Sequence, residues 1–215
     1  FMVDEFIYGD AQRLSPDAPV PVLRSERIER SAGGAANVAT CLHGFGAKVI
    51  CCGVIGDDEA GAWLRSALGE SGDDIEGLVV AAQRPTTIKR SLVGLAQHRH
   101  PQKMFRVDVE SEAPLPDGVE AQVLEHVRAH LGSVDVVCLE DYGKGVCSTA
   151  LCRAIIEEST AAGVQVLVDP ARSVDWARYK GATAMTPNRS ELEEALDRSL
   201  GEGIPDGSAA TEVLE

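Results

Sequence analysis

The sequence predicts an α/β protein built on a doubly wound, mostly parallel sheet with helices on both faces and a small inserted β sheet. From residue 116 onward, apolar segments of strand length alternate with segments of helical periodicity, which is typical of right-handed strand–helix–strand units. Residues 47–56 form a near-continuous apolar run, as in a strand buried on both faces. Proline-rich and alternating segments before residue 110 favour a second, smaller sheet.

The composition limits the kind of partner. The chain has 215 residues, of which 44% are hydrophobic, and this is enough for the buried core of one main domain. Its formal net charge of −14 disfavours nucleic acid and anionic membranes, because both need a basic face. A phosphorylated small molecule needs only a few local cations. We find no apolar run of transmembrane length and no signal-peptide pattern in residues 1–5, so we expect a cytoplasmic location.

The first segments predict a strand, a flap and a hairpin. Residues 1–7 have the pattern of a strand already under way, with Asp4 at its carboxyl end, where open α/β sheets place ligand-binding groups. A solvated aspartate is the equally plausible alternative. Residues 8–23 contain three prolines among β-branched residues, which favours an edge strand in a flap. Residues 85–93 and 103–107 alternate polar and apolar side chains and predict a hairpin that pairs with this flap.

A glycine pair precedes the first predicted helix. Gly33 and Gly34 permit positive φ and the close approach of a ligand, and the small apolar residues after them suit the first turns of a helix. Unpaired N–H groups at a helix start can hold sugar hydroxyls or an anion, and the amide of Asn37 both donates and accepts hydrogen bonds. For a Gly-Gly pair alone, a plain strand-to-helix turn is the alternative.

Periodicity and capping signals predict the remaining elements. The expected helices begin after Asp57 or Asp58, cover 119–131 and 148–162, and open again at Asn188; the expected strands cover 78–80, 134–139, 164–168 and 184–187. Polar residues follow these strands: Glu140, Asp141, Asp169, Asn188 and Glu191. Because the carboxyl ends of parallel strands share one rim, we expect a binding crevice there. Residues 201–215 have little apolar content and are expected to be loosely ordered.

Four ordered motifs resemble the ribokinase-like (PfkB) sugar kinases. They are Tyr8-Gly9 with RLSPDAPVPV at 13–22, GGAANVA at 33–39, EDYGKG at 140–145, and Val168-Asp169-Pro170 with YxGATxxTPNxxE at 179–191. The RLSPDAPVPV run is most similar to the heptose 7-phosphate kinase domains that are often fused to an adenylyltransferase. The resemblance covers residues 1–215 as a partial PfkB-type kinase domain with a ribokinase-like fold, whose β lid comprises about residues 9–32 and 84–108.

The resemblance implies an ATP-dependent kinase that uses Mg²⁺ and phosphorylates the anomeric hydroxyl of D-glycero-β-D-manno-heptose 7-phosphate. It also implies a homodimer formed through the β lid. The sugar hydroxyls would be held by Asp4, Gly33, Gly34 and Asn37, and we include Asp141 among the substrate-binding residues. We assign the substrate phosphate to the cations Arg13, Lys89 and Arg106, for which an exposed strand residue is the alternative. The nucleotide would be bound by Asn188, Arg189, Ser190 and Glu191, with Glu191 acting on Mg²⁺ mainly through water.

One part of the family pattern has no counterpart. The family's catalytic base lies in a later Gly-Ala-Gly-Asp segment, whose helix start also forms the anion hole for the transferred phosphoryl group, and the 215 residues contain no such segment. We therefore assign no catalytic residue and expect a chain that is truncated at both ends and inactive by itself. Two alternatives stay open: a PfkB kinase of another sugar phosphate or nucleoside, and a non-catalytic fragment that binds sugar phosphate or dimerises.

Overall fold

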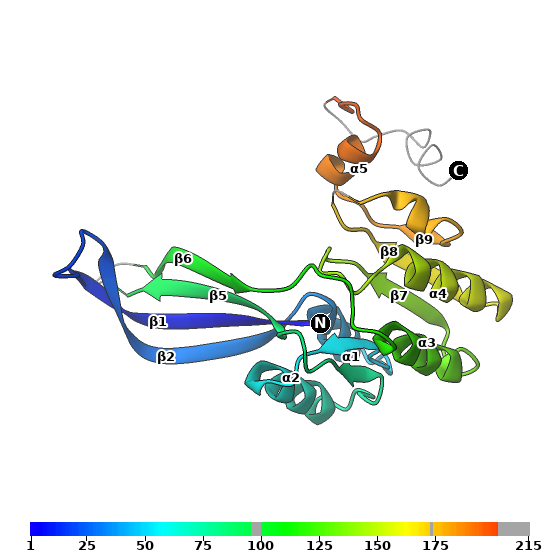
Figure 1. Ribbon diagram of the computed structural model, residues 1–215, viewed down its shortest axis with the longest axis horizontal. Helices are drawn as coiled ribbons and strands as arrows, with labels where there is room; N and C mark the ends of the chain where they lie inside the picture. Colours follow the sequence, from blue (N-terminus) through cyan, green and yellow to red (C-terminus); the bar gives the residue numbers. More distant parts are fainter. Residues whose placement is uncertain (96–99, 173, 202–215) are drawn as a thin grey trace. The chain divides into compact units, whose positions relative to one another are not determined.

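In the computed structural model, which describes residues 1–95, 100–172 and 174–201, the chain divides into two units after Ser111 (Figure 1). Both units combine helices with parallel strand pairs, as the sequence predicts for an α/β protein. Residues 96–99, which belong to the tip of the expected hairpin, and most of the expected loose segment from 201 to 215 lie outside the described residues. Among the described residues, we find no helix with the length and apolar character needed to cross a membrane.

The first unit contains a four-stranded sheet in the order β2-β1-β5-β6. Its strands are β1 (Met2–Leu14), β2 (Pro21–Gly33), β5 (Thr87–Gly94) and β6 (Gln102–Val109). The flap and the hairpin therefore share one sheet, and β2, which begins at Pro21, is one of its edge strands as expected. The predicted end of the first strand was wrong. Asp4 is the third of thirteen residues in β1, because β2 runs antiparallel beside it and continues the backbone ladder.

The first unit also contains two helices and a short parallel strand pair. They are α1 (Ala35–Gly44), α2 (Glu59–Glu70), β3 (Gly53–Ile55) and β4 (Leu78–Val80). Only three residues of the apolar run 47–56 form β3, whose burial on both faces is confirmed. Asp58 caps α2, since its Oδ1 accepts a hydrogen bond from the Gly61 N–H at 2.8 Å. The helices, β3, β4 and the start of β1 enclose one core: Val3, Ala36, Ala39, Cys51, Ile55, Ala60, Leu64, Leu68 and Leu78.

The second unit is built on three parallel strands, β7 (Val136–Glu140), β8 (Gln165–Asp169) and β9 (Ala184–Met185), in that order. Its helices are α3 (Val119–His130), α4 (Thr149–Ala161), the short 3-10 helix η1 (Trp176–Tyr179) and α5 (Arg189–Ala195). Ser148 caps α4 as predicted by accepting a hydrogen bond from the Leu151 N–H at 3.1 Å. The core comprises Leu139, Cys152, Ile156, Val166, Val168 and Tyr179.

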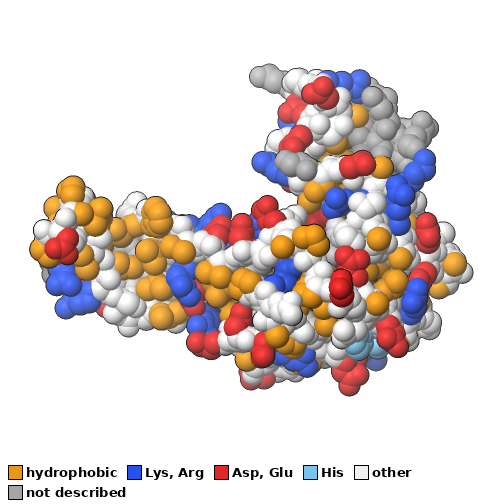
Figure 2. All heavy atoms as spheres, viewed as in Figure 1, with side chains coloured by type: hydrophobic (Ala, Val, Ile, Leu, Met, Phe, Trp, Pro, Cys, Tyr) orange, Lys and Arg blue, Asp and Glu red, His pale blue; other side chains and the backbone are white. Residues whose placement is uncertain are grey.

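The four-stranded sheet has two unlike faces, because in-register residues of neighbouring strands point to the same side. We call the side that carries Asp4 the aspartate face; across β2, β1, β5 and β6 its rows are Ser31–Asp4–Lys89–Asp108 and Glu29–Phe6–Ser91–Arg106. The other side is the valine face, with the rows Ala32–Val3–Ile88–Val109, Arg30–Glu5–Arg90–Val107 and Ile28–Ile7–Leu92–Phe105. Hydrophobic side chains gather over this sheet (Figure 2).

Candidate functional site

Asp4 and the glycine pair lie against one another at the base of the aspartate face. A Cβ atom added to Gly33 would lie 2.8 Å from Oδ2 of Asp4, so a larger residue here would displace this carboxylate. Gly34 has a φ of 55°, which favours glycine, and it directly precedes α1. Asn37 is exposed in the first turn of α1. The structure thus brings a carboxylate, an amide and a helix start into one short region, as the motif implies.

Two of the three predicted phosphate-binding cations share the aspartate face with Asp4. Lys89 is in register with Asp4 on the neighbouring strand, which separates their backbones by roughly 4.8 Å. Arg106 lies one row further along, on the edge strand β6, at a backbone distance of roughly 12 Å from Asp4. Its guanidinium donates to Oδ2 of Asp108 at 2.8 Å. These three side chains lie within the span of one phosphorylated sugar.

The third predicted cation does not join this group. Arg13 lies nine residues beyond Asp4 on β1, which corresponds to roughly 30 Å along the strand, and it is exposed. A single phosphate contacted by Lys89 and Arg106 is therefore out of reach of Arg13 in the same chain. The structure separates the assigned phosphate ligands into two locations.

A buried charge cluster on the valine face was missed by the sequence reasoning. The carboxylate of Glu5 accepts hydrogen bonds from Nε of Arg30, at 2.8 Å, and from Nε of Arg90. Arg30 also donates to the exposed Glu59 at 2.9 Å. Burial by itself would raise the pKa of the Glu5 carboxyl, but the two arginines hold it below its ordinary value. The sequence contains two acidic residues in succession, Asp4 and Glu5, and two basic ones, Lys89 and Arg90. These pairs indicate an ion pair across the sheet only when the register of the two strands is known.

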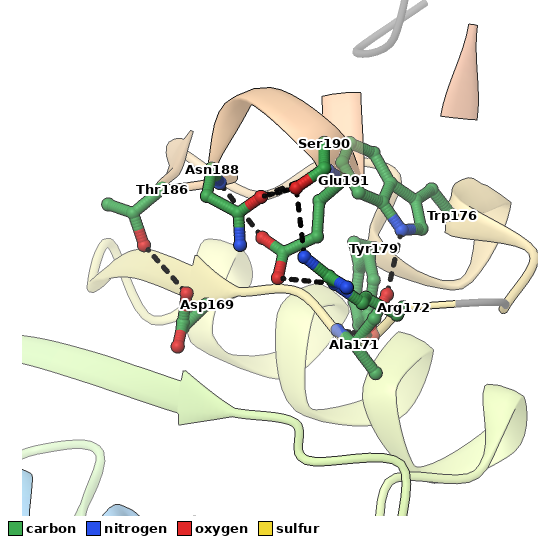
Figure 3. Close-up of polar contacts among 9 residues, drawn as sticks. All are labelled: Asp169, Ala171, Arg172, Trp176, Tyr179, Thr186, Asn188, Ser190 and Glu191. Atoms are coloured by element: carbon green, nitrogen blue, oxygen red, sulfur yellow. Dashed lines mark hydrogen bonds and ion pairs between the residues drawn. The ribbon is translucent and has the colours of Figure 1, made fainter. Parts of the chain in front are cut away.

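The carboxyl ends of the parallel strands in the second unit form the rim that the sequence predicts. Glu140 and Asp169 end β7 and β8 in register, and Thr186 follows β9. The Thr186 hydroxyl donates to Oδ1 of Asp169 at 3.3 Å (Figure 3). Burial raises the pKa of the Glu140 and Asp169 carboxyls. The charge of Asp169 raises the pKa of Glu140 further, and the charge of Glu191 raises that of Asp169. Glu140 and Asp169 therefore place two carboxyl groups next to each other on this rim.

The Asn-x-x-Glu motif forms a capping box at the start of α5. Oδ1 of Asn188 accepts a hydrogen bond from the Glu191 N–H at 3.1 Å, and Oε2 of Glu191 accepts one from the Asn188 N–H at 2.8 Å. Arg172 joins them to the preceding loop, donating to the Ser190 hydroxyl at 2.8 Å and pairing with Oε1 of Glu191 at 3.5 Å (Figure 3). The spacing thus has a local structural cause, and nucleotide binding by Asn188, Ser190, Glu191 and Arg189 stays a prediction.

Asp141 is buried and already has several partners in its own unit. Its carboxylate accepts hydrogen bonds from the Tyr179 hydroxyl at 2.7 Å and from the Gly143 N–H at 2.8 Å, and Arg178 lies 3.5 Å from it. Burial and the bond to Asp141 raise the pKa of Tyr179. These contacts hold the EDYGKG loop against η1, so the predicted sugar contact of Asp141 would need one of them to be exchanged.

The rim also fits the Mg²⁺ that the resemblance implies. Burial, with a smaller contribution from the charge of Glu191, raises the pKa of the partly buried Asp169 carboxyl, and a bound cation would favour its ionised form. Within the described part of the chain, no three His, Cys, Asp or Glu side chains are grouped as a complete metal site. Mg²⁺ sites in proteins usually combine one or two carboxylates with water and substrate phosphates. Asp169 and Glu191 are the carboxylates of the rim that would supply them.

Comparisons with known proteins agree with the fold and the motifs. A family model described as pfkB family carbohydrate kinase matches residues 2–214. The chain is 41% identical over 194 residues to bifunctional protein HldE of Bradyrhizobium diazoefficiens, and 39% identical over 214 residues to the HldE of Rhodopseudomonas palustris strain BisA53. These matches cover 90% and 100% of the chain but only 38% and 43% of the relatives, so the chain spans about two fifths of their length.

Solved structures show the same fold at low sequence identity. Phosphofructokinase-2 from Escherichia coli, in complex with fructose-6-phosphate, matches with a TM-score of 0.73 at 18% identity, over 99% of this chain and 66% of that chain. Arabidopsis thaliana ribokinase, complexed with ribose and ATP, matches with a TM-score of 0.68 at 17% identity, over 99% and 65% of the two chains. The ribokinase-like fold expected from the motifs is thereby confirmed.

Proposed function

The chain belongs to the pfkB family of carbohydrate kinases, and from this membership we propose that it serves the ATP-dependent phosphorylation of the anomeric hydroxyl of D-glycero-β-D-manno-heptose 7-phosphate. The observation that carries this choice of sugar is the identity of about 40% to HldE proteins over at least 90% of the chain. It agrees with the RLSPDAPVPV run, which distinguishes heptose kinases from other members of the family.

The aspartate face would bind the sugar phosphate. Asp4 accepts hydrogen bonds from sugar hydroxyls, and the Asn37 amide together with the backbone at Gly33 and Gly34 holds others. Lys89 and Arg106 bind the 7-phosphate through charge-assisted hydrogen bonds, with Arg106 exchanging its contact to Asp108 for the phosphate. Fixing the sugar at both ends orients the anomeric hydroxyl, which is the main contribution that a protein makes to phosphoryl transfer.

The rim of the second unit would bind the nucleotide. MgATP supplies the phosphoryl group, and its metal neutralises charge on the phosphates. Asp169 and Glu191 would hold the metal, with Glu191 acting through water, and Asn188, Arg189 and Ser190 at the start of α5 would bind the nucleotide. Arg172 keeps Glu191 and Ser190 in place from the neighbouring loop.

Titration calorimetry with heptose 7-phosphate on the 215-residue chain tests the sugar assignment. We expect binding that D4N weakens by at least about tenfold, because Asp4 would lose the charge that strengthens its hydrogen bonds to hydroxyls. R13Q serves as the comparison, with an expected change of less than about twofold since Arg13 lies far along β1. Tighter binding of fructose 6-phosphate or of a nucleoside would favour the alternative family activity. No binding of heptose 7-phosphate would contradict the proposal.

The exposed end of the valine face would form a homodimer contact through the lid. Ile28, Ile7, Leu92 and Phe105 form one apolar row across all four strands, and Ile28 and Phe105 are 56% and 67% exposed. A second copy offering the same row would cover it in an isologous contact. Sedimentation velocity tests this: the wild-type chain should sediment as a dimer, and F105E should be monomeric at the same concentration. F45E, which alters an exposed phenylalanine outside the sheet, should leave the dimer intact.

A further inference from the structure

The Arg30–Glu5–Arg90 cluster lies where the four-stranded sheet leaves the core of its unit. On one side of it, the row of Val3, Ala32 and Ile88 packs into the core with α1 and α2, and Val3 is fully buried. On its other side, the row that contains Ile28 and Phe105 is largely exposed. The cluster is therefore the last row of the valine face before the sheet continues without the support of the helices.

The same cluster lies directly behind the proposed sugar-binding row. Asp4 precedes Glu5 and Lys89 precedes Arg90, and each pair of sequence neighbours points to opposite faces of the sheet. Ser31 is related to Arg30 in the same way on β2. Any shift of one strand past another at Glu5 thus moves Asp4 relative to Lys89 by the same amount.

The rows on either side of the cluster would not prevent such a shift by themselves. A two-residue slip of β1 would keep every side chain on its own face. It would bring Val3 or Ile7 between Arg30 and Arg90, and it would move Glu5 into a row of aliphatic residues. Glu5 forbids the slip, because its buried carboxylate would then face Ile88 or Leu92 in place of Arg90. The forbidden slip would displace Asp4 from Lys89 by roughly 7 Å along the strands.

We propose that the Arg30–Glu5–Arg90 cluster is a positioning device for the sugar site: it fixes the register of β2, β1 and β5 and thereby sets the spacing of Asp4 and Lys89. This inference rests on the proposed binding of a sugar phosphate to the aspartate face. Both arginines engage the carboxylate through Nε, so its place is defined from both neighbouring strands. Glu5 and the arginines touch no substrate in this arrangement and act only through the strands.

A double-mutant cycle on heptose 7-phosphate binding separates positioning from a general loss of stability. E5Q should weaken binding by about tenfold in the wild-type background but by less than about twofold in the D4N background, since the residue it positions is already altered. E29Q is the matched control. Glu29 lies on the aspartate face of β2 and pairs with Arg27 outside the cluster, so E29Q should change binding by less than about twofold. In the E29Q background, E5Q should again weaken the binding of heptose 7-phosphate by about tenfold.

R90K provides a second variant that keeps the positive charge on β5. It should weaken binding by about threefold, again only when Asp4 is present, because a lysine cannot reproduce the Nε contact. If E5Q does not fold, R90K and its cycle with D4N decide the matter. Equal binding by wild type, E5Q and R90K would overturn the positioning role alone, and so would effects that persist in full in the D4N background. Failure of the wild-type chain to bind would overturn the proposed function and this role with it.

Discussion

The two units bury an acidic side chain by different means. In the four-stranded sheet, Glu5 is neutralised by two arginine side chains from the flanking strands. In the second unit, Asp141 is held by the Tyr179 hydroxyl and the Gly143 N–H, with Arg178 further away at 3.5 Å. The difference follows from the backbone: the N–H groups of a central strand are committed to the ladder, whereas those of a loop are free to bind a carboxylate.

The comparison also indicates how each site responds when its acid is removed. Arg30 and Arg90 have side chains that are 24% and 33% exposed, so water can reach their guanidinium groups. Tyr179 is fully buried, so water does not reach its hydroxyl in the folded wild-type chain. Removal of the acid should therefore be more damaging in the second unit, although Glu5 carries the stronger ion pairs.

The largest effect is expected for Asp141. D141A should lower the free energy of unfolding by about 4 kcal/mol, because the buried Tyr179 hydroxyl loses its acceptor and Arg178 loses the neighbouring carboxylate. Urea unfolding monitored by circular dichroism measures this. D135N, at an exposed position of the same unit, should change the value by less than about 0.5 kcal/mol. A D141A protein as stable as D135N would show that the Asp141 contacts do not hold the loop.

Glu5 should give a smaller effect with a defined pH dependence. E5Q should lower the free energy of unfolding at pH 7 by about 2 kcal/mol. The pKa of Glu5 is lowered in the folded chain, so its contribution is complete above the ordinary glutamate pKa and is lost as the pH falls through the lowered folded value. The difference between wild type and E5Q should therefore shrink in acid. A difference that stays constant down to pH 3 would contradict an ionised, arginine-paired Glu5.

These contrasts also mark what sequence reasoning can reach. The glycine pair, the caps of α2 and α4 and the rim at Asp169 each depend on local chemistry or on the geometry of parallel strands, and all were found. Asp4 was wrongly predicted to end its strand, and the ion pairs of Glu5 were not predicted, for the same reason. Both depend on the long antiparallel partner β2, whose register is set by contacts between residues up to 31 positions apart. No pattern within a short window carries that information.

Asp73 is a third case: a buried carboxylate that has neither flanking arginines, as Glu5 has, nor hydrogen bonds from a hydroxyl and a loop N–H, as Asp141 has, among the described residues. Its carboxylate is buried without a hydrogen-bond donor among the described residues, and its nearest partner there is Nδ1 of His43 at 3.2 Å. Burial raises the pKa of Asp73, although His43 opposes this. The resulting stabilisation is present below the ordinary aspartate pKa and is lost as the pH rises through the raised folded value. At neutral pH the ionised carboxylate therefore destabilises the fold.

D73N should accordingly raise the free energy of unfolding at pH 7 by about 1 kcal/mol. This advantage should disappear below about pH 4, where the wild-type carboxyl is protonated in both states. The pH response is thus opposite to that of E5Q. Thermal unfolding between about pH 3 and pH 8 measures it, and D17N at an exposed position supplies the control. A D73N protein that is less stable than wild type at pH 7 would mean that the pair with His43 outweighs the burial of the charge.

The smallest effect is expected at the exposed end of the same cluster that contains Glu5. Glu59 accepts a hydrogen bond from Arg30 at 2.9 Å, almost the distance of the Arg30–Glu5 bond, yet its side chain is 82% exposed. Since water screens an exposed ion pair and replaces its hydrogen bonds, E59Q should change the free energy of unfolding by less than about 0.5 kcal/mol. The same urea unfolding measurement compares E59Q with E5Q. Equal losses in the two variants would contradict the view that burial, and not contact distance, decides what each partner of Arg30 contributes.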